Sequence, residues 1–180
     1  MLNEGLELAL TMARLNHFSH DYHIKTVRLS DLVRQVINEK RRMFIRLHIF
    51  PKIEVAREAI DVLTDPKWMH FVLEQLIQNA CKYTSQMKKD AYLFFYITEQ
   101  EKYIRLSITD EGPGIPKQDL PRIFDPFFTG ENGRQFAEAT GMGLYLVQTI
   151  LTQLQHSIQV ESVVGTGTTF HLLFSKVTKM

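Results

Sequence analysis

The feature that most constrains the fold is a long, two-faced helix that begins at Asp65 and Pro66. An aspartate before a proline favours a helix start, because its carboxylate accepts hydrogen bonds from the first turn and proline fits the first helical position. Apolar side chains then recur at helical spacing to about residue 85, at Met69, Val72, Leu73, Leu76 and Ala80. Such a stripe has to pack against a second layer, so the chain must also supply a sheet or further helices.

The segments around this helix predict the strands of that second layer. Two aromatic and β-branched runs, AYLFFYITEQ at 91–100 and KYIRLSITDEG at 102–112, are joined by a polar break and predict a hairpin of two central strands. Further strands are expected at 46–55, 58–65, 157–162 and 168–174.

Three other helices are expected along the chain. One spans about 3–22, and the stretch DYHIKTVRLS that follows it is interpreted as a short linker. Ser30 is the expected N-cap of a second helix over 31–45, and a third helix runs from about 142 to 154. The predicted fold class is α+β: a two-layer α/β sandwich in which three helices cover one face of a mixed sheet of about five strands, preceded by an N-terminal helix.

Composition excludes several classes of protein. The single cysteine, Cys81, allows no internal disulfide and no paired-cysteine metal site, which suits a reducing compartment. The formal net charge is +1, from 21 basic and 20 acidic residues, and this balance gives no support to nucleic-acid binding. No stretch approaches the roughly 18 apolar residues of a membrane span, and the first residues lack the basic region of a signal peptide.

The central helix has a second, polar stripe opposite the apolar one. Gln75, Asn79 and Lys82 follow one another at i, i+4 and i+7, so their side chains share one face. An asparagine amide oxygen is a neutral ligand that suits Mg²⁺ when substrate phosphates supply the negative charge, and a lysine one turn on can reach those phosphates. Taken alone, this stripe is more typical of a solvated helix face.

Three loops could contribute to a binding site. DEGPGIP at 110–116 follows a strand, and Asp110 at the strand end would offer its carboxylate to a donor such as an exocyclic amine. The segment 129–140 contains two glycines and Arg134 and resembles a mobile lid. The glycines of GMGL at 141–144 indicate either a plain turn or a backbone that approaches phosphates at a helix N-terminus. Each loop alone is also consistent with an ordinary surface turn.

Five segments together resemble, in chain order, the nucleotide-binding boxes of the catalytic domain of bacterial sensor histidine kinases. They are LIQNACKYT at 76–84, DEGPGIP at 110–116, IFDPFF at 123–128, GMGL at 141–144 and GTGTTF at 165–170. That domain belongs to the ATPase group shared with gyrase B, Hsp90 and MutL. Each box is weak alone, but the order of all five is specific, and the resemblance covers about residues 28–176.

The resemblance implies a role for each matching residue. Asn79 resembles the asparagine that binds Mg²⁺, Asn79 and Lys82 form the implied catalytic group, and Asp110 matches the aspartate that reads the amino group of adenine. The other residues expected to contact ATP are Tyr83, Gly112, Gly114, Phe127, Arg134, Gly141, Met142, Gly143, Leu144 and Thr168. The implied ligands are therefore ATP and Mg²⁺, with Asn79 as the expected metal ligand.

Gln75 departs from the pattern of the hydrolysing relatives. In those proteins a glutamate one turn before the asparagine activates water, whereas Gln75 has no basic carboxylate. Glu74 is a neighbour, but it lies about 100° round the helix. This difference argues against fast ATP hydrolysis and for transfer of the phosphoryl group to a better nucleophile.

The activity implied by the resemblance is that of a protein-histidine kinase, which transfers the γ-phosphate of ATP to a histidine for relay to a response-regulator aspartate. The sequence HIKTV at His23 lacks the proline of the acceptor motif, so the acceptor is expected outside this chain. Residues 1–24 are interpreted as the second helix of a dimerisation hairpin with its linker, and 25–180 as the catalytic ATP-binding domain. A non-catalytic nucleotide-binding module and a gyrase-type ATP hydrolase stay open as alternatives.

The expected partners follow from the same resemblance. They are the dimerisation and phosphoacceptor helices of the same kinase, in a homodimer, and a response regulator. The combination of EQLIQNACKYT, TGENGR and GMGLYLV further resembles kinases of the bacitracin-sensing type, which sense cell-envelope antibiotics beside a peptide-exporting ABC transporter. The implied location is the cytoplasmic side of a cell-membrane protein.

Overall fold

The computed structural model describes residues 6, 9–10, 13, 22–130 and 142–176 of the 180-residue chain. Most of the predicted helix over 3–22 and most of the predicted lid over 129–140 lie outside these residues. Within the described ranges, no helix is long and apolar enough to cross a membrane.

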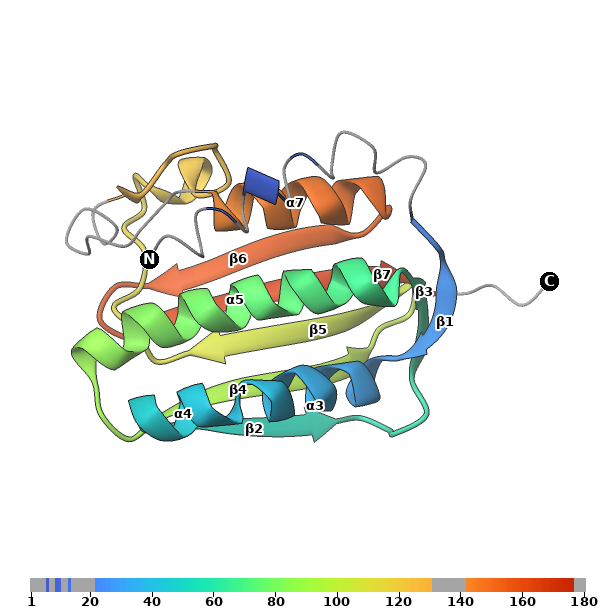
Figure 1. Cartoon of the computed structure of the whole chain (residues 1–180), viewed down its shortest axis with the longest axis horizontal. Helices are drawn as coiled ribbons and strands as arrows, with labels where there is room; N and C mark the ends of the chain where they lie inside the picture. Colours follow the sequence, from blue (N-terminus) through green and yellow to red (C-terminus); the bar gives the residue numbers. More distant parts are fainter. Residues whose placement is uncertain (1–5, 7–8, 11–12, 14–21, 131–141, 177–180) are drawn as a thin grey trace.

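A mixed five-stranded sheet forms one layer of the molecule (Figure 1). Its strands, in spatial order, are β2 (Ile49–Val55), β4 (Ala91–Glu99), β5 (Tyr103–Asp110), β7 (Gly167–Ser175) and β6 (Ser157–Val163). β2 pairs with β4 in parallel, and the other three pairs are antiparallel. The predicted hairpin of two central strands is therefore confirmed as β4 and β5.

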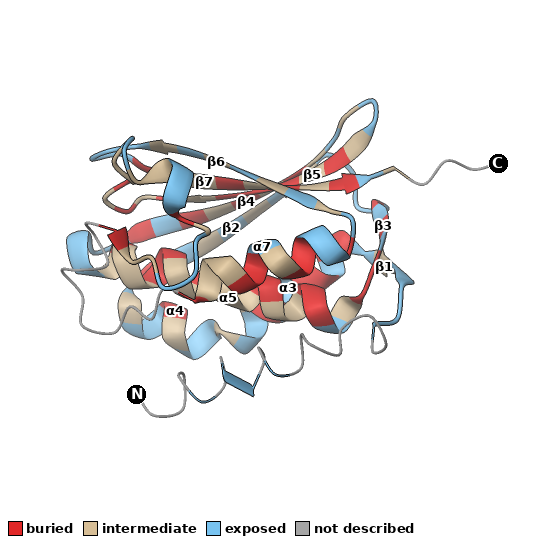
Figure 2. Cartoon of the chain, turned by 90° about the horizontal axis from the view of Figure 1, so that it is seen from above, coloured by how far each residue is buried: buried red, intermediate tan, exposed pale blue. Residues whose placement is uncertain are grey.

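The helices form the second layer, on one face of this sheet (Figure 2). They are α3 (Leu29–Glu39), α4 (Arg41–Leu47), α5 (Pro66–Met87) and α7 (Gly143–Gln153), with a short 3₁₀ turn, η1, at Leu120–Arg122. The predicted α+β sandwich, with a mixed sheet of five strands covered on one face, is confirmed.

The central helix α5 begins where the sequence predicts. The Asp65 carboxylate accepts hydrogen bonds from the backbone N–H groups of Lys67 and Trp68, at 2.9 and 3.2 Å, and Pro66 occupies the first helical position. The predicted apolar stripe is buried against the sheet; its members Met69, Val72, Leu73, Leu76 and Ala80 are all at most 5% exposed. The opposite edge of the same helix is left to line a cleft.

The prediction of one helix over 31–45 with Ser30 as its N-cap is wrong in two respects. It is two helices, because the chain breaks at Lys40, which has φ −93° and ψ 10°. Ser30 is not the N-cap: it lies inside α3, and its buried hydroxyl donates to the carbonyl of Glu58 at 3.4 Å. Arg28 is the residue before the helix and makes no side-chain cap.

The stretch interpreted as a linker contains a strand that the sequence analysis missed. β1 (Lys25–Arg28) pairs antiparallel with β3 (Asp61–Thr64) in a separate two-stranded ladder. The backbone N–H of His23, just before β1, donates to the Asp65 carboxylate at 2.7 Å. This small ladder therefore holds the start of α5 in place. The predicted division between residues 24 and 25 stays a prediction.

Candidate functional site

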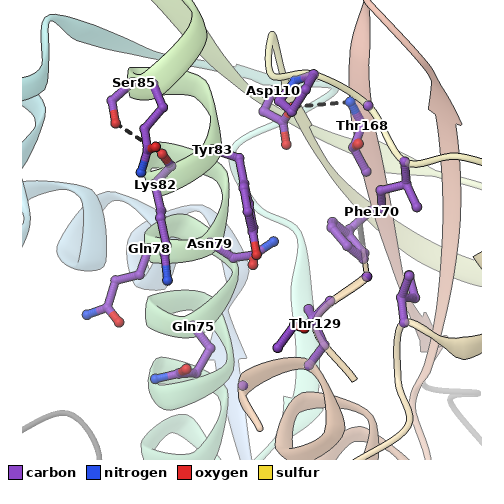
Figure 3. Close-up of a pocket in the computed structure, with 18 of the residues that line it drawn as sticks. Gln75, Gln78, Asn79, Lys82, Tyr83, Ser85, Asp110, Thr129, Thr168 and Phe170 are labelled. Carbon is purple, nitrogen blue, oxygen red and sulfur yellow. Dashed lines mark hydrogen bonds between the residues drawn. The ribbon is translucent and has the colours of Figure 1, made fainter. Parts of the chain in front are cut away.

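A cleft of about 590 Å³ opens beside α5, at the end of the sheet where β5 ends and β7 begins (Figure 3). Most residues of the predicted site line it together. They are Gln75, Asn79, Lys82, Tyr83, Asp110, Gly114, Gly143, Leu144 and Thr168. They come from α5, β5 and its following loop, α7 and β7, so four separate parts of the sequence converge on one cavity.

Other predicted residues lie elsewhere. Arg134 and Gly141 lie outside the described residues. Gly112 and Met142 lie beside the cleft without lining it: Gly112 donates its N–H to Asp110, and buried Met142 precedes α7. Phe127 is 73% exposed, whereas its neighbour Phe128 lines the cleft.

Asp110 is the most unusual group in the cleft. Its carboxylate is buried, and its Oδ1 accepts hydrogen bonds from the backbone N–H groups of Gly112 and Thr168, at 2.9 and 3.1 Å. Among the described residues no group donates to its Oδ2. Burial raises the pKa of Asp110 from 3.8 to about 6, although the two backbone hydrogen bonds act in the opposite direction. The protein therefore fixes one oxygen and leaves the other for a donor that enters the cleft.

Two glycines let backbone segments pack closely near this aspartate, Gly167 against Asp110 itself and Gly114 against the end of β6. A Cβ on Gly167 would lie 2.0 Å from the carbonyl oxygen of Asp110, and Gly167 has φ +146°. Gly114 has φ +76°, and a Cβ there would lie 2.3 Å from the carbonyl oxygen of Val163. Because both contacts are with backbone, neither position can accept a side chain without moving the loop or β7. These glycines fit the protein's own strands together around Asp110.

The polar stripe of α5 faces the cleft rather than open solvent. Figure 3 shows Asn79 and Tyr83 on the side of the helix toward Thr129 and Phe170, Gln78 and Lys82 on the other side, and Gln75 one turn further along the helix. The Tyr83 hydroxyl has a raised pKa because of burial, so it stays protonated at neutral pH. These residues are half-buried and line the cleft, and their role in binding stays a prediction.

The cleft has an electrical polarity. Three of the described residues that line it are cations. Lys40 immediately precedes α4, Arg46 lies within α4, and Lys82 lies on α5. The lining also contains two carboxylates on other elements, Asp110 at the end of β5 and Asp119 just before η1. A ligand with an amine at one end and negative charges at the other would match this arrangement.

Several lining residues had no role in the sequence analysis. Phe170 follows Thr168 by two positions on β7, and the strand period of two could have identified it. Gln78 lies between Gln75 and Lys82 on α5 and could have been found from helical spacing. Because α4 packs on α5, the cleft is also lined by Lys40, Met43, Arg46 and Leu47. No local sequence pattern predicts that packing.

Comparison with known proteins identifies this arrangement. Residues 64–178 match the family described as histidine kinase-, DNA gyrase B- and HSP90-like ATPases. The matched region includes α5, Asp110, α7 and Thr168, and so contains nearly all of the cleft. Only the wall formed by Lys40 and α4 lies before it.

Curated relatives extend the similarity over almost the whole chain. The sensor histidine kinase YxdK of Bacillus subtilis is 40% identical over 176 residues, which are 98% of this chain and 53% of that protein. The sensor protein BceS of Halalkalibacterium halodurans is 36% identical, over 95% of this chain and 49% of that protein. The chain thus spans about half the length of the curated relatives it matches.

Solved structures share the fold. The nucleotide-free catalytic domain of the histidine kinase ThkA superimposes with a TM-score of 0.74 at 24% identity, covering 86% of this chain and 96% of that domain. ThkA in complex with the response regulator protein TrrA gives a TM-score of 0.76 at 22% identity, covering 98% of this chain and 49% of that one. At these identities the likeness establishes the fold alone.

Proposed function

The chain belongs to the family of histidine kinase-, DNA gyrase B- and HSP90-like ATPases, and we propose that it is the ATP-binding catalytic domain of a sensor histidine kinase. The observation that carries this proposal is the arrangement of charges in the cleft: a buried carboxylate with one open oxygen at the end of β5, and three cations on the side formed by α4 and α5. The sensor-kinase names of its relatives support the kinase over other members of the family.

Asp110 fits the purine of ATP. With Oδ1 held by two backbone N–H groups, Oδ2 is positioned to accept a hydrogen bond from the exocyclic amine of adenine. Thr168 contributes its backbone N–H to this grip, and its hydroxyl lies 2.8 Å from that of Ser162. Phe170 and Tyr83 supply apolar and aromatic surface for the ring.

The residues near the triphosphate fit a magnesium ion that the phosphates also bind. Among the described residues no group of three His, Cys, Asp or Glu side chains could hold a metal by itself. Asn79 instead offers a neutral amide oxygen at the cleft wall, the donor expected where phosphate oxygens complete the coordination. Bound there, Mg²⁺ would neutralise charge on the phosphates.

The chain's own residues then act by positioning. Asp110 fixes the base, Asn79 and Lys82 orient the phosphates, and Gly143 at the start of α7 leaves room for the chain to approach them. Gln75 has no carboxylate to take a proton from water. The γ-phosphoryl group would therefore pass to a histidine ring nitrogen as its bond to ADP breaks, rather than to water.

The remaining roles belong to the parent protein and rest on the relatives. The acceptor histidine would lie on dimerisation helices of the same kinase in a homodimer, to which residues 1–24 would contribute, and Arg134 would close over the phosphates as part of a lid. The phosphohistidine would serve a response regulator, the kind of partner that ThkA binds in its complex with TrrA. The parent would be membrane-anchored with this domain in the cytoplasm, and a neighbouring ABC transporter would supply the signal.

Binding of Mg-ATP to the chain tests the proposal. Calorimetry should give saturable binding to the wild type that depends on Mg²⁺, and Asn79→Ala should weaken it by roughly tenfold to a hundredfold, since one metal ligand is lost. Asn38→Ala, on the exposed side of α3, is the matched control and should bind like the wild type. Transfer of label from ATP to a histidine-bearing hairpin supplied in trans should follow binding; multiple turnover without that hairpin would favour a hydrolase instead.

A further inference from the structure

Four side chains form a row of linked contacts that begins at the cleft and lies at the junction of α3, α4 and α5. The Lys40 ammonium lies 2.7 Å from one carboxylate oxygen of Glu74, and the Nδ1 of His70 lies 2.8 Å from the other. The Nε2 of His70 lies 2.5 Å from a carboxylate oxygen of Glu39. These four side chains are 22–44% exposed, so the row of contacts is half-buried between the helices.

At this exposure such contacts contribute little to stability. Their geometric effect is larger, because Glu74 has both oxygens engaged and His70 is held at both ring nitrogens. Lys40, at one end of this row of contacts, is consequently held where it also lines the cleft. Glu74 itself points toward α3 and α4 and is committed to these two partners.

Lys40 is placed there by the break between α3 and α4. The residues from 29 to 47 are helical except at this point, although the sequence contains neither glycine nor proline nearby. The Lys40 N–H bonds the carbonyls of both Val36 and Ile37, at 3.1 and 3.2 Å, and the chain changes direction after it. The turn carries α4 against α5, so that Met43 and Leu47 line the same cleft as Lys40.

Through its contact with Glu74, Lys40 lies at the level of α5 where the far end of a bound nucleotide would be. Gly112, whose N–H binds Asp110, packs against Thr84, so the base end of the cleft lies at the level of Thr84. From Thr84 back to Gln75 the helix rises about 13 Å. An extended nucleoside triphosphate that starts at Asp110 would bring its last phosphate to the level of Gln75, next to Glu74 and its partner Lys40.

We propose that Lys40 contacts the terminal phosphate of the bound nucleoside triphosphate, and that Glu74 and His70 act as positioning residues for it. The proposal rests on the function proposed above and adds a contact from outside the region that matches the family, residues 64–178. Lys82 lies two helical turns closer to the base end, so it would meet the inner phosphates, whereas Lys40 would meet the phosphate that distinguishes ATP from ADP.

The ratio of ATP to ADP affinity tests this assignment. In Lys40→Met, calorimetry with Mg²⁺ should show ATP binding weakened by about fivefold to twentyfold and ADP binding changed by less than about twofold, since one charge-assisted contact is lost. Lys40→Arg keeps the charge and should restore most of the ATP preference. Glu74→Gln should give a partial loss, because its amide no longer holds the ammonium by charge.

Lys176→Met is the matched control. Lys176 pairs with Glu99 at 3.3 Å with similar exposure, away from the residues that line the cleft. Its melting temperature should fall as little as that of Lys40→Met, and its ATP to ADP ratio should equal that of the wild type. An unchanged ratio in Lys40→Met, with wild-type ATP binding, would overturn the proposal while leaving the proposed function intact; a wild type that binds neither nucleotide would overturn both.

Discussion

The core beneath α5 and the cleft beside it are built from one helix and obey different rules. The face toward the sheet is apolar and fully buried, and Leu73 and Val72 on it have no exposed surface. The face toward the cleft consists of half-buried amides and a lysine, with a buried carboxylate across from it. The buried apolar core is expected to supply most of the folding free energy. The cleft, in contrast, keeps polar groups at positions where apolar side chains would make the protein more stable. A titratable side chain with a shifted pKa belongs to each region, Asp110 in the cleft and part-buried His156 against the core residue Phe174, which makes the comparison measurable.

Truncation in the core should have the largest effect. Leu73→Ala leaves a cavity in a close-packed layer and should lower the free energy of unfolding by about 2–5 kcal/mol. Urea denaturation measures this loss. At a temperature where the variant is folded, its Kd for Mg-ATP should equal that of the wild type, because Leu73 does not line the cleft. A weaker Kd in the folded variant would show that core and cleft are not separable.

Removing the cleft's buried charge should have the opposite pair of effects. In Asp110→Asn the side-chain oxygen can still accept from Gly112 and Thr168, but the amide group would face the amine of adenine with donors. ATP affinity should fall by roughly tenfold to a hundredfold. Stability at pH 7 should rise, because the wild-type carboxylate is ionised there at a cost of about 3 kcal/mol, from a pKa of about 6 against 3.8. The substitution should weaken the binding of inosine triphosphate, which has an oxygen in place of the amine, less than it weakens the binding of ATP.

The pH dependence of stability provides the control for this variant. Between pH 4 and 6 the folded state keeps a proton on Asp110 that the unfolded chain has released, so this group makes stability fall as pH rises. At the edge of the core, between α7 and β6, burial lowers the pKa of His156 from 6.5 to about 4, so the unfolded chain takes the proton first and stability falls as pH drops through the same window. The two slopes oppose each other in the wild type.

Single substitutions should therefore expose each slope. Asp110→Asn should leave stability rising with pH between 4 and 6, by up to about 1.4 kcal/mol per pH unit. His156→Gln, which can still bond the Thr64 hydroxyl that His156 contacts at 2.8 Å, should leave stability falling with pH over the same range. Denaturation curves at four or five pH values measure both. Parallel curves for the two variants would contradict the assignment of these groups.

What could be predicted from the sequence follows the range of the interactions involved. The start of α5 depends on Asp65 and its immediate neighbours, and the β4–β5 hairpin on residues a few positions apart, so local patterns predicted both. The strand β1 depends on β3, more than 30 residues away, and its four residues carry no distinctive alternation. The break at Lys40 has no local signal either, because no glycine or proline lies near it.

The site divides in the same way. Asp110, Asn79 and Thr168 carry recognisable boxes, and the fold brings them into one cavity, as expected. The contribution of α4 and the ion chain from Lys40 to Glu39 depend on helix packing, which spacing along the sequence does not encode. Sequence thus predicted the half of the cleft that recurs in a family and missed the wall that lies before the matched region.

The smallest effect should come from a glycine at the edge between the two regions. Gly143 is the first residue of α7, and a Cβ there would lie 2.9 Å from the side-chain oxygen of Gln75. Because that atom ends a flexible side chain, Gln75 can rotate away at a cost of about 0.5–1.5 kcal/mol, and the higher helix propensity of alanine offsets part of it. Gly143→Ala should keep wild-type stability and weaken ATP binding by roughly twofold to tenfold.

A double-mutant cycle shows whether that loss is transmitted through Gln75. If Gly143→Ala acts by displacing this side chain, adding it to Gln75→Ala should cost nothing further, because the atom it would displace is already gone. Additive losses would mean that the alanine methyl obstructs the nucleotide directly, and that Gly143 serves the approach of phosphates to the start of α7. Either result assigns this glycine to the cleft; a fall in stability without a change in ATP affinity would assign it to the core.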